Sequence, residues 1–290
     1  MSINGGSKPT PSAHSLTRRY RAATLKKTAF VGGTRDEAGQ HGTCGGLGAP
    51  PMIKLVTFQK RVAQLTRPAF ERRWETIHGP IAAAFPGLRG YVLGFSLDDG
   101  EPLADGVAQL WFDTRESCQA SYASEIGRNG SKDASAWLAR REHLLASECW
   151  LKRSGALSST PFKLLLCLKR RVDKSRASFL DRLGTLATPA ICTVTGASQA
   201  RLSLDEAGQL LNSKVAGDLT LVTGEAPYDA LVELWFIERD AAQRGREQLR
   251  AWKDQVFKPD EIARWEDALL REHVVVMPPP PAFGVEEGQI

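Results

Sequence analysis

The sequence has little cysteine, and none of it is clustered. The 290 residues contain no C-x-x-C pair, and the five cysteines are widely spaced: Cys44, Cys118, Cys149, Cys167 and Cys192. A disulfide framework or a zinc ribbon requires closely spaced cysteines, so both are excluded. Cys167 and Cys192 lie inside apolar runs and are interpreted as small core residues in a reducing cytoplasm.

Long apolar runs and local catalytic signatures are also missing. No apolar run approaches the roughly 20 residues that span a bilayer. Residues 1–22 lack the continuous apolar core of a secretory signal. The chain has no H-E-x-x-H motif, no Walker loop, and no local Ser-His-Asp or Cys-His signature. These absences argue against membrane, zinc, nucleotide and serine-hydrolase functions, and we expect a cytoplasmic protein.

The body of the chain has no excess of positive charge. The formal net charge is +5, and residues 1–51, with seven basic and two acidic side chains, account for all of it. The neutral remainder offers no electrostatic footprint for DNA or RNA. Residues 1–51 are rich in Ser, Thr, Gly and Arg, so we expect a disordered basic tail. It is either a targeting peptide or an extension ahead of a start at Met52, and we favour the second.

The most informative feature that is present is an internal repeat. Residues 53–61 match 162–170 at an offset of 109, and residues 109–112 match 233–236 at an offset of 124. The larger offset predicts about 15 extra residues in the second copy, within 204–226.

Each copy reads as β-α-β-β-α-β. In the first copy we expect strands at 53–61, 90–97, 106–112 and 144–152, a helix capped by Thr66, and a second helical stretch over 115–143. In the second copy we expect a strand at 162–170, a helix capped by Ser175, helical sequence near 241–253 and 261–270, and a last strand at 273–277. The opening strands are apolar at nearly every position, so both of their faces are covered.

This pattern predicts an α+β fold of two fused ferredoxin-like units, whose antiparallel four-stranded sheets pack on each other as a barrel. The first unit spans 52–153, the second 161–277, and residues 278–290 form a loose, proline-rich C-terminus. A doubly wound parallel sheet is the alternative. Short turns between the middle strands and the absence of a glycine-rich phosphate loop argue against it.

Three short motifs carry a resemblance to a known family: Trp74-x-x-x-His78-Gly79-Pro80, Pro86-Gly87-Leu88, and the run from Asp105 to Phe112. Together they resemble the EthD family of the dimeric α+β barrel superfamily. The resemblance implies a pocket between sheet and helices that suits small apolar molecules. It also implies roles in ether degradation or in tailoring aromatic polyketides. The second copy has Leu183 and Ala187 in place of the tryptophan and histidine, so we interpret it as a partner that completes the barrel.

His78 is the leading candidate for catalysis, because it shares a predicted helix face with Phe70 and Trp74 and imidazole exchanges protons near neutral pH. The alternative is a structural histidine that bonds a nearby carbonyl. Asp105 is a second catalytic candidate, as a base or as a group that orients His78. The alternative is that Asp105-Gly106 is an ordinary turn at the start of a strand. Trp74, Tyr91, Trp111 and Phe70 are candidate substrate-binding residues. Core packing is the competing interpretation of these aromatics.

The leading hypothesis is a cofactor-independent enzyme, either monooxygenase-like or a cyclase or isomerase. It would act on a small apolar, aromatic or polyketide-like molecule. A second hypothesis is a non-catalytic binding or accessory protein for hydrophobic metabolites. A third is a haem-binding oxidoreductase that uses His143 or His273, which are otherwise interpreted as solvated helix ends. We expect no cofactor and no metal, no membrane or nucleic-acid partner, and either a monomer with an internal pseudo-dimer or a homodimer.

Overall fold

The computed structural model describes residues 52–153, 161–205, 209–215, 218–223, 226–258 and 260–280, with 209–215 and 218–223 as backbone only. All of them belong to the compact unit Cys44–Ile290. The expectations for residues 1–51 and 281–290 lie outside this part of the chain. Within it, no helix is long and apolar enough to cross a membrane.

The strands form the core of the fold. They are β1 (Ile53–Arg61), β2 (Leu88–Ser96), β3 (Gly106–Phe112), β4 (Leu138–Lys152), β5 (Phe162–Arg170), β6 (Gln199–Asp205), β7 (Gln209–Val215), β8 (Asp218–Thr223), β9 (Ala230–Phe236) and β10 (Ile262–Val276). The helical segments are α1 (Arg67–Arg73), the π turn η1 (Trp74–His78), α2 (Gly79–Ala83), α3 (Arg115–Ala123), α4 (Glu125–Ser135), α5 (Arg176–Arg182), the π turn η3 (Leu183–Ala187), α6 (Thr188–Cys192) and α7 (Arg239–Val256).

Eight strands close into a barrel in the order β1-β3-β2-β10-β5-β9-β6-β4. The two closing contacts, β10 with β2 and β4 with β6, join strands that are far apart in the sequence, and both are antiparallel. The antiparallel α+β prediction is therefore confirmed, and a doubly wound parallel sheet is excluded. Closure also leaves these eight strands without a free edge.

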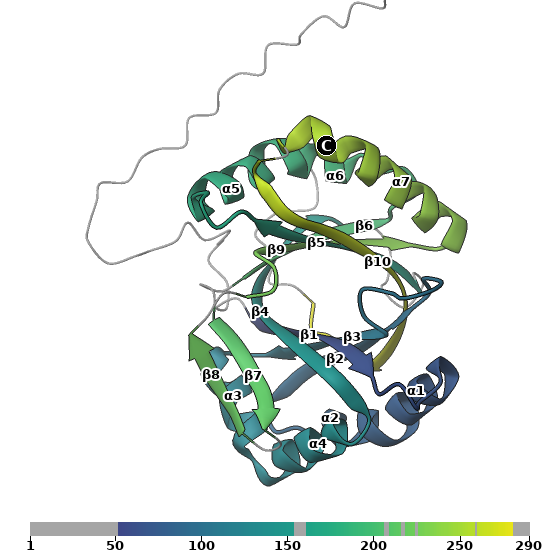
Figure 1. Cartoon of the computed structure of the whole chain (residues 1–290), viewed down its shortest axis with the longest axis vertical. Helices are drawn as coiled ribbons and strands as arrows, with labels where there is room; N and C mark the ends of the chain where they lie inside the picture. The colour runs from purple at the N-terminus through teal and green to yellow at the C-terminus, as the bar shows by residue number, and fades with distance from the viewer. Residues whose placement is uncertain are drawn as a thin grey trace, which may run out of the picture. The chain divides into compact units, whose positions relative to one another are not determined.

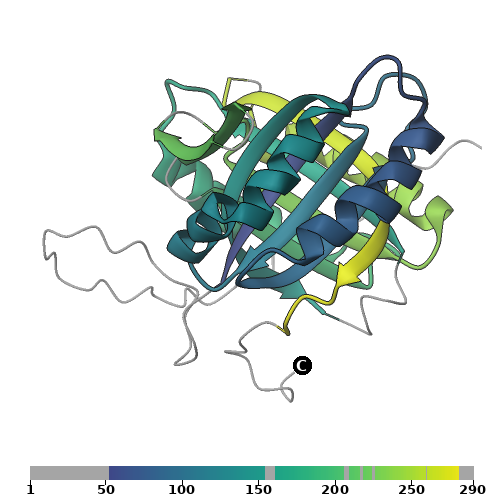
Figure 2. The same ribbon diagram turned by 90° about the horizontal axis from the view of Figure 1, so that it is seen from below.

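The helices lie outside the barrel in two groups, with α1 to α4 on one side and α5 to α7 on the other (Figures 1 and 2). Successive residues of a strand point to opposite faces. Thus Leu55 packs in a cluster with Phe70 under the first helices, while its neighbour Val56 packs with Leu165 inside the barrel. This arrangement explains why the opening strands are apolar at nearly every position.

Two helical predictions are wrong at the ends of the barrel. The stretch 115–143 is not one helix, because Ser124 adopts an extended conformation and caps α4, and β4 begins at Leu138. The stretch 261–270 is strand rather than helix. In both places pairing with the neighbouring strand determines the conformation. Strand β4 begins early enough for Leu138 to pair with Arg61 of β1, and β10 begins early enough for Ile262 to pair with Arg170 of β5. Backbone pairing overrides the helical preference of these charged segments.

The additional residues predicted within 204–226 fall at a separate hairpin. In the part of the chain that the structure describes, its strands β7 and β8 pair only with each other. The hairpin lies beside α3 on the outside of the barrel (Figure 1).

The first helix is capped as predicted but is interrupted where the site begins. The Thr66 side chain accepts a hydrogen bond from the Ala69 N–H at 3.4 Å. The helix then widens into the π turn η1, in which the Gly79 N–H bonds the Trp74 carbonyl. Pro80 cannot donate to the helical ladder, which favours this widening. Gly79 permits it, since a Cβ at this position would lie 2.8 Å from the Trp74 oxygen.

Candidate functional site

The π turn places His78 beside a carboxylate that is distant in the sequence. His78 Nδ1 lies 3.0 Å from Asp133 Oδ2, and the His78 ring packs edge-on against Trp137. Asp133 also accepts hydrogen bonds from Arg73 at 2.5 Å and from the Trp137 indole at 3.2 Å. The hydrogen bond from His78, assisted by the charge of Arg73, lowers the pKa of Asp133 from its usual range. Asp133 therefore stays ionised and can hold the proton of His78 on Nδ1.

His78 lines a small cavity between the first four strands and their helices. The cavity encloses about 30 Å³, room for one or two water molecules. Its sheet side and its helix side together comprise Thr57, Gln59, His78, Ala82, Phe85, Tyr91, Ala108, Leu110, Tyr122, Gly130, Ser131, Ala134, Arg141 and His143. This volume is far below the few hundred Å³ of a usual ligand pocket. A ring-sized ligand is larger than this volume, so the cavity would have to widen to admit one.

A second histidine lies on the opposite wall of this cavity. His143 is a strand residue, only 3% exposed, and its Nδ1 lies 2.9 Å from Thr57 Oγ1. The interpretation of His143 as a solvated helix end is therefore wrong. Burial, with a smaller effect from Arg141, lowers the pKa of His143 to about 3. Its imidazole is neutral at physiological pH and can exchange hydrogen bonds without carrying charge.

The four aromatic residues predicted to bind substrate are divided between two faces of the sheet. Phe70, Trp74 and Tyr91 pack together under the helices, and the Trp74 indole donates to the Tyr91 hydroxyl at 2.9 Å. Burial raises the pKa of that hydroxyl well above its usual range, so Tyr91 stays neutral. Trp111 belongs to the other face, because its neighbours Leu110 and Phe112 point to the helices.

Asp105 bonds an arginine rather than His78. Its carboxylate accepts the Arg61 N–H at 3.0 Å and forms an ion pair with the Arg61 guanidinium. Asp229 repeats this arrangement with the Arg170 N–H at 2.9 Å. Both carboxylates fix the end of an opening strand, which is a structural task at the rim of the barrel.

We expect Asp105→Asn to lower the free energy of unfolding by about 1.5–3 kcal/mol, the usual worth of a hydrogen bond to a charged group. The buried carboxylate, which is 1% exposed, holds both the backbone and the side chain of Arg61. Urea denaturation measures the loss. Ligand affinity at the His78 cavity should remain unchanged, and a loss of affinity without a loss of stability would instead favour a catalytic role for Asp105.

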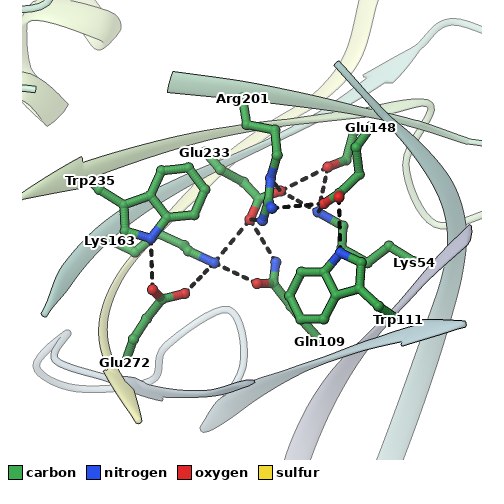
Figure 3. A network of polar contacts seen from close by, with 10 residues as sticks. Lys54, Gln109, Trp111, Glu148, Lys163, Arg201, Glu233, Trp235 and Glu272 are labelled. Carbon is green, nitrogen blue, oxygen red and sulfur yellow. Dashed lines mark hydrogen bonds and ion pairs between the residues drawn. The ribbon is translucent and has the colours of Figure 1, made fainter. Parts of the chain in front are cut away.

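The interior of the barrel holds a network of charged side chains that the sequence-based candidates did not include (Figure 3). On one side, Glu148 accepts from the Trp111 indole at 2.9 Å and pairs with Lys54 at 2.9 Å. On the other side, Glu272 accepts from the Trp235 indole at 2.7 Å and pairs with Lys163. The two Lys-Glu-Trp groups repeat each other. In the sequence, the lysine at the second position of each opening strand could have indicated this network.

Glu233 joins the two groups at the centre. It is fully buried, pairs with Lys54, lies 2.9 Å from Lys163 and accepts from Arg201 at 2.8 Å. Gln109 occupies the equivalent position on β3 and donates to Glu233 at 2.7 Å. Burial would raise the pKa of Glu233, but the nearby cations, Arg201 foremost, hold it well below its usual range.

Three tryptophan rings surround the Arg201 guanidinium. Its central carbon lies 5.5 Å from the ring centre of Trp111, 4.9 Å from that of Trp150 and 4.8 Å from that of Trp235. Rings and carboxylates together compensate for the lost hydration of this cation. The network thus balances three cations with three carboxylates, and we assign it to the stability of the barrel.

Neither predicted haem ligand has surroundings that fit a macrocycle. His143 borders a cavity of about 30 Å³, and His273 is exposed on β10. Among the described residues no group of three or more His, Cys, Asp or Glu side chains is arranged to hold a metal ion.

These features define a closed antiparallel α+β barrel in which His78, paired with Asp133, lines a small cavity beneath the first helices. Residues 63–141, which contain this pair, match the family model described as the EthD domain. This part of the chain is therefore similar to EthD domains.

An uncharacterised 11.0 kDa protein from the thcB–thcC intergenic region of Rhodococcus erythropolis is 30% identical over 67 residues. The match spans 22% of this chain and 65% of that relative, slightly less than two thirds of its length.

Two solved structures share the barrel fold. An anthrone oxidase-like protein has a TM-score of 0.53 at 11% identity, with 78% of this chain and 93% of that chain covered. A proposed monooxygenase from Fusobacterium nucleatum has a TM-score of 0.50 at 9% identity, with 81% and 97% covered. At these identities the likeness concerns the fold.

Proposed function

We propose that the chain is a cofactor-independent enzyme that moves a proton on a small apolar, aromatic or polyketide-like molecule. One observation carries the proposal: His78, which pairs with Asp133, lines a cavity within the segment that matches the EthD domain. Asp133 holds the proton on Nδ1, which leaves Nε2 of His78 as the basic nitrogen. Nε2 has no hydrogen-bond partner among the described residues.

The pair can act as a general base because its parts are arranged in the usual order. The carboxylate orients the imidazole and stabilises the positive charge that appears when Nε2 takes a proton. Trp137 packs against the His78 ring, and Phe70 packs in turn against Trp137. Oxygenation, cyclisation and isomerisation of an activated aromatic or ketone can all begin with this removal of a proton.

Anthrone is a suitable first probe, because the name of one structural neighbour refers to its oxidation. Removal of a proton from the central CH₂ group gives a carbanion that can react with dioxygen itself. One anthrone and one dioxygen then give one anthraquinone and one water. The panel should also contain enolisable ketones, for which proton transfer alone gives the product.

We expect His78→Gln to lower turnover on an accepted substrate by 10²–10⁴-fold, the usual contribution of a positioned base. Product formation by mass spectrometry, with oxygen uptake for anthrone, measures the effect. The exposed histidine of β10 provides a matched control, and His273→Gln should retain full turnover. Undiminished turnover in His78→Gln would refute the proposal. Binding of the probes without any product would favour a non-catalytic binding protein.

We also propose that the barrel consists of two fused ferredoxin-like units, 52–153 and 161–277. The support is the equivalent strand order in the two halves, β4-β1-β3-β2 and β10-β5-β9-β6. The second unit has Leu183 and Ala187 at the ends of its π turn, where the first has Trp74 and His78. It therefore lacks the base and would complete the barrel rather than react.

A further inference from the structure

The π turn after the first helix allows Arg73 and His78, five residues apart, to reach the same partner. In an α-helix of 3.6 residues per turn, side chains at this spacing point in different directions. In the turn Trp74–His78 the Gly79 N–H bonds the Trp74 carbonyl five residues back. This wider spacing brings residues five apart nearly above one another, and such turns are frequent at functional sites.

The shared partner is Asp133 of α4. Its Oδ1 atom accepts a hydrogen bond from the Arg73 guanidinium at 2.5 Å. Its Oδ2 atom lies 3.0 Å from His78 Nδ1 and accepts from the Trp137 indole at 3.2 Å. The Arg73 guanidinium also lies over the Trp137 ring, 5.9 Å from the ring centre. Arg73 thus holds one oxygen of the carboxylate and leaves the other for the imidazole.

The Asp133 carboxylate needs to be held because it is not enclosed. Its side chain is 17% exposed, so without Arg73 it would be free to turn toward water. The arginine cation also favours the ionised form of the carboxylate. The proton shared between Asp133 and His78 then stays on the imidazole, at Nδ1. Both effects leave Nε2 as the basic nitrogen.

We infer that Arg73 is a positioning residue for His78 and acts through Asp133. Its charge and its hydrogen bond hold the carboxylate against Nδ1, and so fix the tautomer in which Nε2 takes the proton. The effect on turnover rests on the proposed function. The effect on the His78 tautomer requires no reaction, so it can be measured separately.

The second unit contains the same arginine without the histidine. Arg182 precedes the π turn Leu183–Ala187 and pairs with Glu261 at 3.0 Å. The arginine and carboxylate are 29% and 17% exposed in the first unit, and 33% and 21% exposed in the second. If both arginines only tie a helix to its surroundings, removing either one should have the same effect. Arg182→Gln is therefore the matched control for Arg73→Gln.

NMR of the full chain labelled with ¹⁵N-histidine tests where the proton lies. The chain has five histidines, and His78→Gln identifies the signals of His78. In the neutral imidazole of the parent and of Arg182→Gln, we expect a protonated Nδ1 and an unprotonated Nε2. Arg73→Gln should instead show signals averaged between the two tautomers. Parent-like His78 signals in Arg73→Gln would overturn the inference.

Rescue by lysine tests the role of the charge. Arg73→Lys keeps the cation but loses the planar fork of the guanidinium. Its His78 signals should lie closer to those of the parent than the signals of Arg73→Gln do. Identical signals in the lysine and glutamine variants would contradict the role given to the charge.

Turnover on an accepted substrate is the second readout. Arg73→Gln should lower kcat about tenfold and leave KM within about twofold, because the lost hydrogen bond acts on the base rather than on substrate binding. Arg182→Gln should retain the parent kcat. An equal fall in kcat in the two variants would indicate a structural role and contradict the inference.

The two readouts separate this inference from the proposed function. If the His78 tautomer follows Arg73 but no substrate is ever turned over, the proposed enzyme fails and the positioning role stands. If turnover depends on His78 while Arg73→Gln changes neither the tautomer nor kcat, only the inference fails.

Discussion

Replacing Glu233 with glutamine is expected to destabilise the barrel by about 3–5 kcal/mol, as is usual when one partner of a buried ion pair is removed. The carboxylate is fully buried and contacts Lys54, Lys163 and Arg201. Without its charge, these three cations share only Glu148 and Glu272. The glutamine amide would also place N–H donors against donors. Thermal or urea denaturation measures the loss.

The effect of Glu233 should depend on pH. Its pKa is well below the unfolded value of 4.5, because Arg201 and the two lysines outweigh the effect of burial. A carboxyl with a depressed pKa contributes its full stability above the unfolded pKa and loses it as pH falls through the folded pKa. The difference between the parent and Glu233→Gln should therefore be constant above about pH 5 and shrink progressively below pH 4.

A surface glutamate and a charge swap serve as controls. Glu101 forms an ion pair with Lys60 but is 83% exposed, so Glu101→Gln should leave the unfolding midpoint nearly unchanged. The double variant Gln109→Glu/Glu233→Gln restores the charge balance, because residue 109 already contacts Lys163. It should recover part of the loss. No recovery would mean that the position of the carboxylate matters more than the total charge.

Gly106→Ala is also expected to be strongly destabilising. It should lower the free energy of unfolding by about 3 kcal/mol, the upper end of the usual cost of overpacking. A Cβ at Gly106 would lie 2.2 Å from Trp74 Cζ3 and 3.1 Å from the Gly94 oxygen. Trp74 cannot move aside, because it is fully buried and its indole donates to Tyr91. Displacement of this indole would also disturb the cavity wall that Tyr91 forms. The fall in unfolding midpoint is the measurement.

Gly184→Ala is the matched control for this prediction. Nothing would lie within 4 Å of a Cβ at Gly184, which occupies the exposed side of η3. Alanine in a helical position is favoured over glycine by about 0.5–1 kcal/mol. Gly184→Ala should therefore be neutral or slightly stabilising. If both alanine variants unfold at the parent midpoint, Trp74 is less tightly held than the packing indicates.

Local patterns predicted much of the fold, because they report on burial and on backbone chemistry. The strand at 106–112 has its predicted bounds, and Thr66 and Ser175 cap the helices that they were expected to cap. The two charged stretches at the barrel ends were misassigned as helix. Their strand conformation depends on long-range pairing with β1 and β5, which local propensity does not contain.

The candidate site was predicted in part, for a similar reason. His78 was expected to point inward from a helix with Phe70 and Trp74, and all three are buried. Its acidic partner is Asp133, 55 residues away on α4, whereas the sequence offered Asp105. Trp111 was grouped with Trp74 by residue type, yet the strand places its ring among Lys54 and Glu148 inside the barrel.

The sequence by itself determined the α+β class, the caps of two helices, and an inward histidine two residues before a proline. Periodicity, capping and turn chemistry are properties of neighbouring residues, so they can be recognised without the fold. Only the tertiary structure decided which side chains meet. It brought Asp133 to His78, left Gln59 and Ser131 unpaired in one cavity, and surrounded Glu233 with three cations. Those contacts depend on the register of strands around a closed barrel, which links residues far apart in the chain.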